Sequence, residues 1–282
     1  MNTLASTILS LAMTASTQAV TTLFVDDFSA DTSSEYATGG YVGWGSAGSL
    51  SISGNGSATF TTPENGFSYF GFGRSLGYDV LTTEGDVLTV SVTFSLSGIS
   101  STDGIIALYA SNSSDATTSE SPYPSTSQAV GTSILPSGGA NSLRVLGDTG
   151  SVSGILNTWS GDIVYGDKTS LTALEAYTSY TLTMIVTRLS GDSYSVSVSL
   201  NGTELTDSSI TVSALDSISE VGLRYYAVNN TDYSDFTMSI TEFSATTTSN
   251  IPEPNEATFM LGGAMLFMLL LLRRSNVRLS TR

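Results

Sequence analysis

The sequence predicts an all-β protein, with an antiparallel β-sandwich between about residues 20 and 250. Three observations favour this fold class. Apolar and hydroxyl side chains alternate with period two in several segments, as they do in strands that bury one face. Glycine and asparagine turn signals separate these segments, and the helical spacing of apolar residues is rare. The length of 282 residues allows a large core, and short strands joined by turns favour a sandwich.

The clearest alternation lies in the segment 86–96, where Val and Leu or Phe alternate with Ser and Thr. Segments 180–188 and 194–200 repeat this pattern, so each predicts a strand with one dry face and one wet face. The dipeptide Asn201–Gly202 follows directly. It predicts a two-residue hairpin turn, because both residue types tolerate a positive φ.

The last predicted strand covers residues 235–243. Phe243 falls out of phase with the apolar residues before it, which predicts a bulge or the end of the strand. The region 111–170 is less regular, and its Ser-rich stretch 111–128 predicts a long surface loop. A second small domain between residues 100 and 170 stays open as an alternative.

Composition excludes several classes of function. The chain has 25 acidic and nine basic residues and a formal net charge of −16, so binding to nucleic acid is not expected. It contains no cysteine and no histidine. Disulfides, Cys-ligated zinc and a Ser-His-Asp triad are therefore excluded. An enzyme built from this chain would have to use carboxylates, tyrosine or a hard metal ion.

The N-terminal residues 1–19 predict a signal peptide. Residues 4–15 are mildly apolar, and Thr17-Gln18-Ala19 is a small-residue cleavage site. The segment departs from the usual pattern because it has no Lys or Arg before its apolar part. Export of the domain formed by residues 20–250 is the expected consequence.

The C-terminal segment 251–282 has three consecutive parts. Residues 257–272 are free of charge and would form a helix of about 24 Å, which is short for a transmembrane helix. The basic tail 273–282 should stay on the cytoplasmic side of the membrane. The sandwich would then lie outside the cell.

The motif Pro252-Glu253-Pro254, then the apolar helix, then Arg273-Arg274 resembles the PEP-CTERM sorting signal of Gram-negative bacteria. The resemblance covers about residues 250–282 and implies processing by an exosortase-type membrane enzyme. It also implies anchoring in the membrane at least transiently, and a final place at the cell surface or in the extracellular matrix. The prolines suit such a role, because they hold the recognition peptide extended.

The body resembles the concanavalin A-like jelly roll of laminin-G-like and related lectin or glucanase domains. The segments that carry this resemblance are 23–31, the hairpin 179–205 and the closing stretch 218–245. It implies a two-sheet antiparallel sandwich and makes extracellular polysaccharide a candidate partner. A jelly roll supports many functions, so the fold alone does not assign one.

One pair of acids suggests carboxylate chemistry. Glu84 and Asp86 stand two residues apart, a spacing that places side chains on one face of a strand, as in a glycosidase cleft. However, the third acid of the glucanase motif is absent, and Gly85 between them favours a turn. We therefore expect no catalytic residue here.

Calcium is the only cofactor that the sequence suggests. Asp26 and Asp27 open the body, while Asp232 and Asp235 precede its last predicted strand. If the first and last strands lie side by side, these four acids could bind Ca²⁺, which takes six to eight oxygen ligands. The structural alternative is that they cap turns and keep the protein soluble.

Exposed aromatic side chains are usual platforms for sugar rings, and the candidates here are Trp44, Trp159 and Tyr226. Any one of them is more often a packing residue. Tyr225 and Tyr226 must lie on opposite faces of a strand, so one of them should belong to the core.

Three functions are consistent with these features. The leading one is a non-enzymatic surface or matrix protein that is structural or binds glycans. The alternatives are a carboxylate-dependent polysaccharide-cleaving enzyme and a calcium-stabilised adhesin. Retention on polysaccharide, sugar release and chelator sensitivity distinguish the three.

Overall fold

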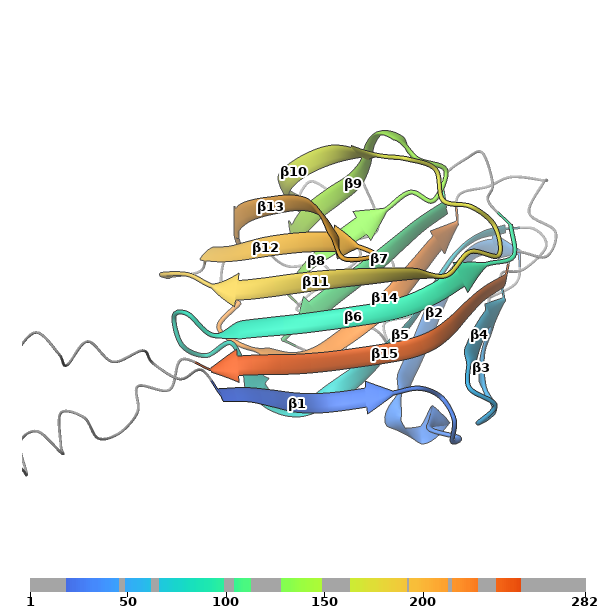
Figure 1. Ribbon diagram of the computed structural model, residues 1–282, viewed down its shortest axis with the longest axis horizontal. Helices are drawn as coiled ribbons and strands as arrows, with labels where there is room; N and C mark the ends of the chain where they lie inside the picture. The colour runs from blue at the N-terminus through green and yellow to red at the C-terminus, as the bar shows by residue number, and fades with distance from the viewer. Residues whose placement is uncertain are drawn as a thin grey trace, which may run out of the picture. The chain divides into compact units, whose positions relative to one another are not determined.

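The computed structural model describes residues 19–45, 49–61, 66–98, 104–112, 128–148, 163–191, 193–212, 215–227 and 237–249, and a few strand residues by their backbone alone. Residues 20–249 form one compact unit. Its strands make two antiparallel sheets that pack face to face around one core (Figure 1). The prediction of an antiparallel β-sandwich is therefore confirmed.

The first sheet has eight strands, and seven of them follow in the order β13-β12-β11-β6-β15-β4-β3, while β1 also pairs with β15. Their bounds are Ala19–Asp26 for β1, Ser49–Ile52 for β3, Ala58–Thr61 for β4, Val87–Leu96 for β6, Tyr180–Arg188 for β11, Ser193–Leu200 for β12, Thr203–Thr211 for β13 and Thr237–Ser249 for β15.

The second sheet has seven strands in the order β10-β9-β8-β7-β14-β5-β2. Their bounds are Ala37–Gly45 for β2, Gly66–Val80 for β5, Gly104–Ser111 for β7, Ala129–Ile134 for β8, Gly139–Asp148 for β9, Ile163–Leu171 for β10 and Ile218–Ala227 for β14. A short 3-10 helix, η1 (Ser33–Glu35), lies between β1 and β2.

The eight-stranded sheet has one dry and one wet face, as the alternation predicts. In β6 every second residue is buried, and the buried set continues in β11 and β12. These side chains point into the core: Leu88, Val90, Val92, Phe94, Leu96, Leu182, Met184, Val186, Tyr194, Val196 and Val198. The predicted hairpin turn is also confirmed, because Asn201 and Gly202 have φ values of 50° and 75°.

The seven-stranded sheet is buried on both faces at its centre. In β7, Ile106 and Leu108 belong to the core cluster. Ala107 and Tyr109 point the other way and are also fully buried, with 0% exposure. Strands buried on both faces show no alternation of apolar and polar residues. For this reason the sequence pattern did not reveal β8 or the centre of β9, which lie in the region expected to be irregular. In the same region, β10 pairs with β9 in a register that shifts twice.

The first and last strands are neighbours, as the calcium hypothesis required. β1 pairs with β15, and the ring centroids of Phe24 and Phe243 lie 5.2 Å apart. The register of β15 against β6 shifts between Ile240 and Glu242. This bulge brings Phe243 onto the core face and confirms the irregularity predicted there.

Residues 104–112, 128–148 and 163–171 contribute β7, β8, β9 and β10 to the same sheet as β14. The signal peptide expected at residues 1–19 lies outside the described residues except for Ala19, the first residue of β1, and the tail expected from 251 to 282 lies outside them entirely. Within the described ranges, no helix is long and apolar enough to cross a membrane.

Candidate functional site

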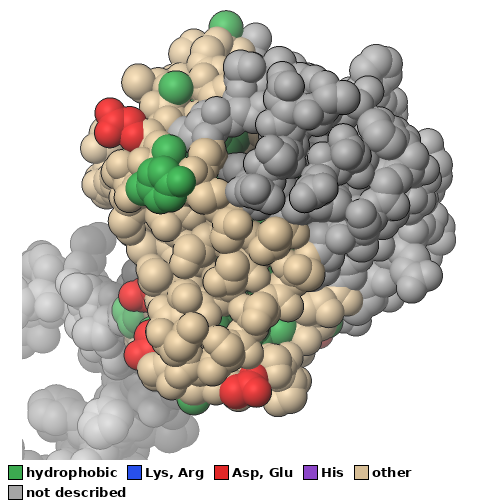
Figure 2. All heavy atoms as spheres, turned by 90° about the vertical axis from the view of Figure 1, so that its right-hand side faces the viewer, with side chains coloured by type: hydrophobic (Ala, Val, Ile, Leu, Met, Phe, Trp, Pro, Cys, Tyr) green, Lys and Arg blue, Asp and Glu red, His purple; other side chains and the backbone are tan. Residues whose placement is uncertain are grey.

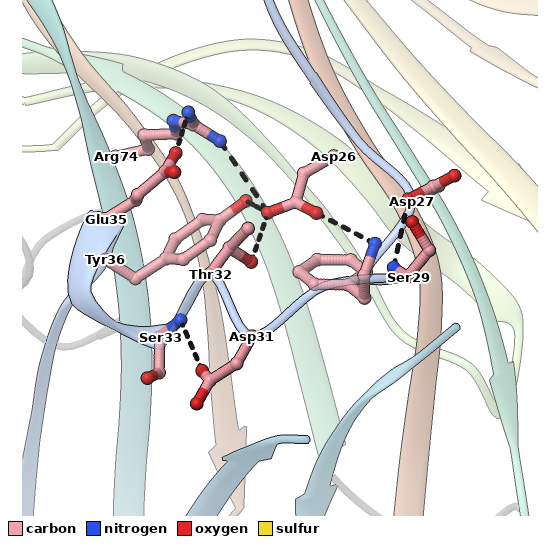
Figure 3. A network of polar contacts seen from close by, with 10 residues as sticks. Asp26, Asp27, Ser29, Asp31, Thr32, Ser33, Glu35, Tyr36 and Arg74 are labelled. Carbon is pink, nitrogen blue, oxygen red and sulfur yellow. Dashed lines mark hydrogen bonds and ion pairs between the residues drawn. The ribbon is translucent and has the colours of Figure 1, made fainter. Parts of the chain in front are cut away.

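A polar cluster around two buried residues, Asp26 and Tyr36, lies where β1 ends. We call Asp26, Thr32, Glu35, Tyr36 and Arg74 the Asp26 cluster (Figure 3). The Asp26 carboxylate is only 5% exposed. One of its oxygens, Oδ2, accepts hydrogen bonds from the Thr32 hydroxyl at 2.6 Å and the Tyr36 hydroxyl at 2.9 Å. The chain therefore folds back over Asp26 between β1 and β2.

The remaining oxygen of Asp26 is also occupied. Oδ1 accepts a hydrogen bond of 2.8 Å from the backbone N–H of Phe28, a residue with a positive φ of 54°. Two exposed acids make the same kind of turn nearby. Asp27 accepts from the N–H of Ser29, and Asp31 from the N–H of Ser33, each at 3.0 Å.

Arg74 reaches the cluster from β5 in the other sheet. Its guanidinium lies 3.6 Å from Oδ2 of Asp26 and also pairs with Glu35. The same guanidinium lies over the ring of Phe24, 4.4 Å from its centroid, and 5.5 Å from that of Tyr36. These contacts connect the two sheets with charge and aromatic packing together.

The protonation of Tyr36 follows from its burial. Burial raises the pKa of Tyr36 well above its usual value, and the Asp26 carboxylate raises it further against the opposing effect of Arg74. Tyr36 therefore keeps its proton and donates to Asp26 at every physiological pH. The hydrogen bonds from Ser29 and Ser33 lower the pKa values of Asp27 and Asp31.

These contacts bear on the predicted calcium ligands. Asp26 already uses both carboxylate oxygens within the protein, while Asp27 is exposed and bonds only its own turn. Asp232 and Asp235 lie outside the described residues. Among the residues that the structure does describe, no group of three or more acids is placed to hold a metal ion. A calcium site therefore stays a prediction.

The acid pair at the start of β6 forms a turn. Gly85 has a φ of 87°, and Oδ2 of Asp86 accepts a hydrogen bond of 2.9 Å from the N–H of Thr83. Asp86 is 6% exposed, whereas Glu84 is exposed to solvent. The spacing of Glu84 and Asp86 had suggested that both carboxylates share one face of a strand. They do not, because these residues lie in the turn before β6.

The predicted aromatic contacts are only partly visible. Trp44 lies in β2 opposite Phe67, and Tyr226 lies in β14 opposite Ile105, but their side chains and all of Trp159 lie outside the described parts. Tyr225 is 3% exposed and belongs to the core. This confirms that one residue of the Tyr225–Tyr226 pair is a core residue.

A second buried cluster was not found from the sequence. Tyr109, Glu220 and Arg224 lie on the face of the seven-stranded sheet that points away from the core, and we call them the Tyr109 cluster. The Tyr109 hydroxyl donates to Oε1 of Glu220 at 3.2 Å. The Arg224 guanidinium lies 6.0 Å from the centroid of the Tyr109 ring. Arg224 and Glu220 are each 2% exposed.

Glycines make room for this cluster. A Cβ on Gly71 would lie 2.8 Å from Cγ of Arg224, and one on Gly222 would collide with the Tyr109 hydroxyl. Gly71 belongs to β5 and Gly222 to β14, so two neighbouring strands leave room for the side chains of Arg224 and Tyr109. In the sequence, such glycines only lower the strand propensity of their segment and do not reveal which side chain they make room for.

The wet face of the eight-stranded sheet is an ordered array of hydroxyl groups. Serines and threonines of β6, β11, β12 and β15 face outward, and we call this set the hydroxyl face: Thr89, Ser91, Thr93, Ser95, Thr181, Thr183, Thr187, Ser193, Ser195, Ser197, Ser199, Ser239, Ser244, Thr246 and Thr248. All of them are half-buried.

The hydroxyl face is ordered by the strand register. One row across four strands joins Ser199, Thr183, Ser91 and Ser244. Within that row the hydroxyls of Ser91 and Thr183 lie 2.9 Å apart. Neighbouring strands are about 4.8 Å apart, and outward residues of one strand repeat about every 6.8 Å. The face therefore presents uncharged donors and acceptors at regular intervals.

The comparisons with known proteins agree on the fold. No protein-family model matches the chain, and no curated protein matches it significantly. The carbohydrate recognition domain of Emp46p, in its potassium-bound form, has a TM-score of 0.50 at 11% identity. That similarity covers 75% of this chain and 88% of the other.

Two further solved structures are similar over most of their length. Peanut lectin with a 9-mer peptide has a TM-score of 0.49 at 15% identity, covering 82% of this chain and 98% of that one. A galectin-like-fold protein of unknown function from Bacillus subtilis has 0.47 at 13% identity, with 81% and 97% covered. The similarity to the Emp46p domain, at a TM-score of 0.50, agrees with a sandwich of the jelly-roll type, and identities this low show the fold alone.

Proposed function

We propose that this chain is an exported, non-enzymatic surface or matrix protein whose sandwich binds uncharged polysaccharide. The hydroxyl face carries this proposal. It combines many hydroxyl groups on four neighbouring strands. On β12, β11, β6 and β15 the rows through Ser91 and Thr89 contain no charged side chain, and the first acids in these rows, Glu204 and Asp207, lie on β13. Such a surface can exchange hydrogen bonds with water for hydrogen bonds to the hydroxyls of a sugar chain.

Charge restricts the choice of polymer. With a formal net charge of −16, the protein repels polyanions such as uronate-rich or sulfated chains. A neutral polysaccharide meets no such repulsion, and its repeating units would contact successive rows of hydroxyls. Many weak, repeated contacts produce strong retention on a polymer even when each contact is weak.

The fold is compatible with this function. The carbohydrate recognition domain of Emp46p has a similar sandwich, and we transfer from it only the idea that such a sandwich can present a sugar-binding surface. The same architecture can support enzymes and purely structural modules. Binding to polysaccharide would therefore depend on the hydroxyl face of this chain.

The location of the protein is part of the proposal. The apolar N-terminal segment and the motif Pro252-Glu253-Pro254 with Arg273-Arg274 support export, passage through the membrane and processing by an exosortase-type enzyme. Replacing both prolines by alanine should leave the tail attached and keep the protein in the membrane fraction. Normal processing of that variant in a host with the enzyme would contradict this assignment.

A panel of immobilised polysaccharides tests the function. Residues 19–249 are suitable, because they contain every described strand and the whole core cluster. We expect retention on neutral polymers without release of reducing sugar, with or without calcium. Release of sugar would instead support the polysaccharide-cleaving alternative, and retention only with calcium would support a calcium-stabilised adhesin.

A further inference from the structure

Tyr177 lies in the loop between β10 and β11 and is the most exposed large hydrophobic residue in the described part of the chain. Its side chain is 80% exposed, compared with 53% for Tyr78. Its φ is 59°, in the left-handed region. A bulky residue with positive φ is uncommon, because its Cβ crowds the backbone there, and Gly or Asn would fit with less strain.

The loop fixes this conformation from both sides. The N–H of Tyr177 donates to the carbonyl of Leu96 at the end of β6, at 2.7 Å. Two residues earlier, the N–H of Glu175 donates to the Tyr180 hydroxyl at 2.7 Å. Leu174 is buried at 5% exposure and anchors the loop in the core cluster. These two hydrogen bonds and the buried Leu174 therefore hold Tyr177 at a positive φ that a tyrosine rarely adopts.

The residues beside Tyr177 leave its ring accessible. Ala176 precedes it and Thr178 follows it, and Ala173 and Ser179 are small exposed residues of the same loop. Figure 2 looks onto the end of the sandwich where β6 ends. The described surface there is mostly uncharged, with a few acidic side chains and no basic one in view. A single ring on such a surface is too small an apolar patch for a stable protein interface.

We propose that Tyr177 stacks on a pyranose ring of an uncharged polysaccharide. This inference rests on the proposed function and names a contact outside the hydroxyl face itself. A tyrosine ring offers a broad apolar face and a hydroxyl that can donate and accept, which suits the C–H face and the hydroxyls of a neutral sugar. Strained residues that surrounding contacts hold in place are often functional.

The position of the loop supports this assignment. Leu96, which binds the Tyr177 backbone, follows Ser95, the last hydroxyl residue of β6. Thr181 is the first outward residue of β11 after the same loop, and its hydroxyl lies 3.0 Å from that of Thr93. A chain bound along the hydroxyl face would therefore meet this loop at the strand ends.

Three variants of Tyr177 test the inference on the polysaccharide that retains the wild-type domain. Tyr177→Ala should weaken binding at least tenfold, while Tyr177→Phe should keep most of it, because the ring remains. Tyr177→Gly should also lose binding, yet it should melt at the same temperature as the wild type or higher, because glycine accepts the positive φ. Tyr78→Ala, at the other exposed tyrosine, serves as the matched control.

The outcomes separate this inference from the proposed function. Wild-type retention with an unchanged Tyr177→Ala variant would overturn the role of Tyr177 and leave polysaccharide binding in place. Equal losses in Tyr177→Ala and Tyr78→Ala would also overturn it, because the effect would not be specific. No retention of the wild type on any neutral polymer would contradict both proposals.

Discussion

The guanidinium of Arg74 lies 3.6 Å from the carboxylate of Asp26, although β1 and β5 belong to different sheets. The pair is therefore a polar connection between the two layers. Asp26 is almost fully buried, and Arg74 has 19% of its side chain exposed. Buried polar groups that are fully hydrogen-bonded fix the arrangement of the elements around them.

Removing Asp26 should destabilise the sandwich. Asp26→Ala would leave the hydroxyls of Thr32 and Tyr36 without their acceptor and take one partner from Arg74. Loss of one member of a buried charge pair costs about 3–5 kcal/mol, and we expect the lower end because Glu35 still pairs with Arg74. Urea unfolding followed by tryptophan fluorescence measures this loss.

The neighbouring acid is the matched control for that experiment. Asp27→Ala changes an exposed carboxylate that bonds only the N–H of Ser29, so its urea midpoint should stay close to that of the wild type. If Asp26→Ala and Asp27→Ala unfolded at the same urea concentration, the Asp26 cluster would not be the connection between layers described here.

Tyr36 predicts how stability changes at alkaline pH. Its pKa is raised by burial in the folded protein, from a usual value of 10.0. The folded state then holds a proton that the unfolded chain releases, so stability is complete below pH 10 and falls as the pH rises further. The slope from this one group is at most about 1.4 kcal/mol per pH unit.

The difference between the wild type and Tyr36→Phe isolates this contribution. Other tyrosines titrate in both proteins, and their effects cancel when unfolding free energies are compared between pH 8 and pH 11. The unfolding free energy of the wild type should fall relative to that of Tyr36→Phe as the pH passes 10. A constant difference across that range would show that the Tyr36 hydroxyl is not buried as described.

Gly222 is expected to tolerate no side chain. A Cβ at this position would collide with the Tyr109 hydroxyl and lie 2.7 Å from the carbonyl oxygen of Phe72. Gly222→Ala should therefore destabilise the protein by about 1–3 kcal/mol through overpacking. Gly98→Ala is the control, because nothing lies within 4 Å of a Cβ there. Equal thermal stability of the two variants would contradict the packing around the Tyr109 cluster.

Calcium binding is a separate prediction. If Asp232 and Asp235 contribute to a site, millimolar Ca²⁺ should raise the melting temperature relative to EDTA, because a ligand of the folded state stabilises it. Replacing both residues by serine should remove that rise. Identical melting curves with calcium and with EDTA would exclude a calcium site that matters for stability.

The sequence predicted the parts of the fold that depend on local pattern. Alternation identified β6, β11 and β12, the dipeptide Asn201–Gly202 identified the hairpin, and the phase of Phe243 identified the bulge in β15. Each of these features depends on residues that are close in sequence. The hydroxyl face follows from the same alternation, although its register across four strands does not.

Features that depend on distant contacts could not be predicted. Strands β8–β10 are buried on both faces or irregular in register, so they lack the period-two signal. The partnership of Asp26 with Arg74 requires knowledge of which strands face each other across the core. Tyr177 looks like an ordinary loop residue in the sequence, because only the backbone geometry reveals its positive φ.

The most direct test of the account places a charge on the hydroxyl face. Thr89 lies in the row with Ser197, Ile185 and Thr246 and has no acid directly opposite it, and Thr89→Glu should weaken retention on a neutral polysaccharide at least tenfold while the domain still melts cooperatively. Thr82→Glu adds the same charge at an exposed residue of the β5–β6 turn and should leave retention unchanged. Equal retention of both variants and the wild type would contradict the hydroxyl face as the binding surface.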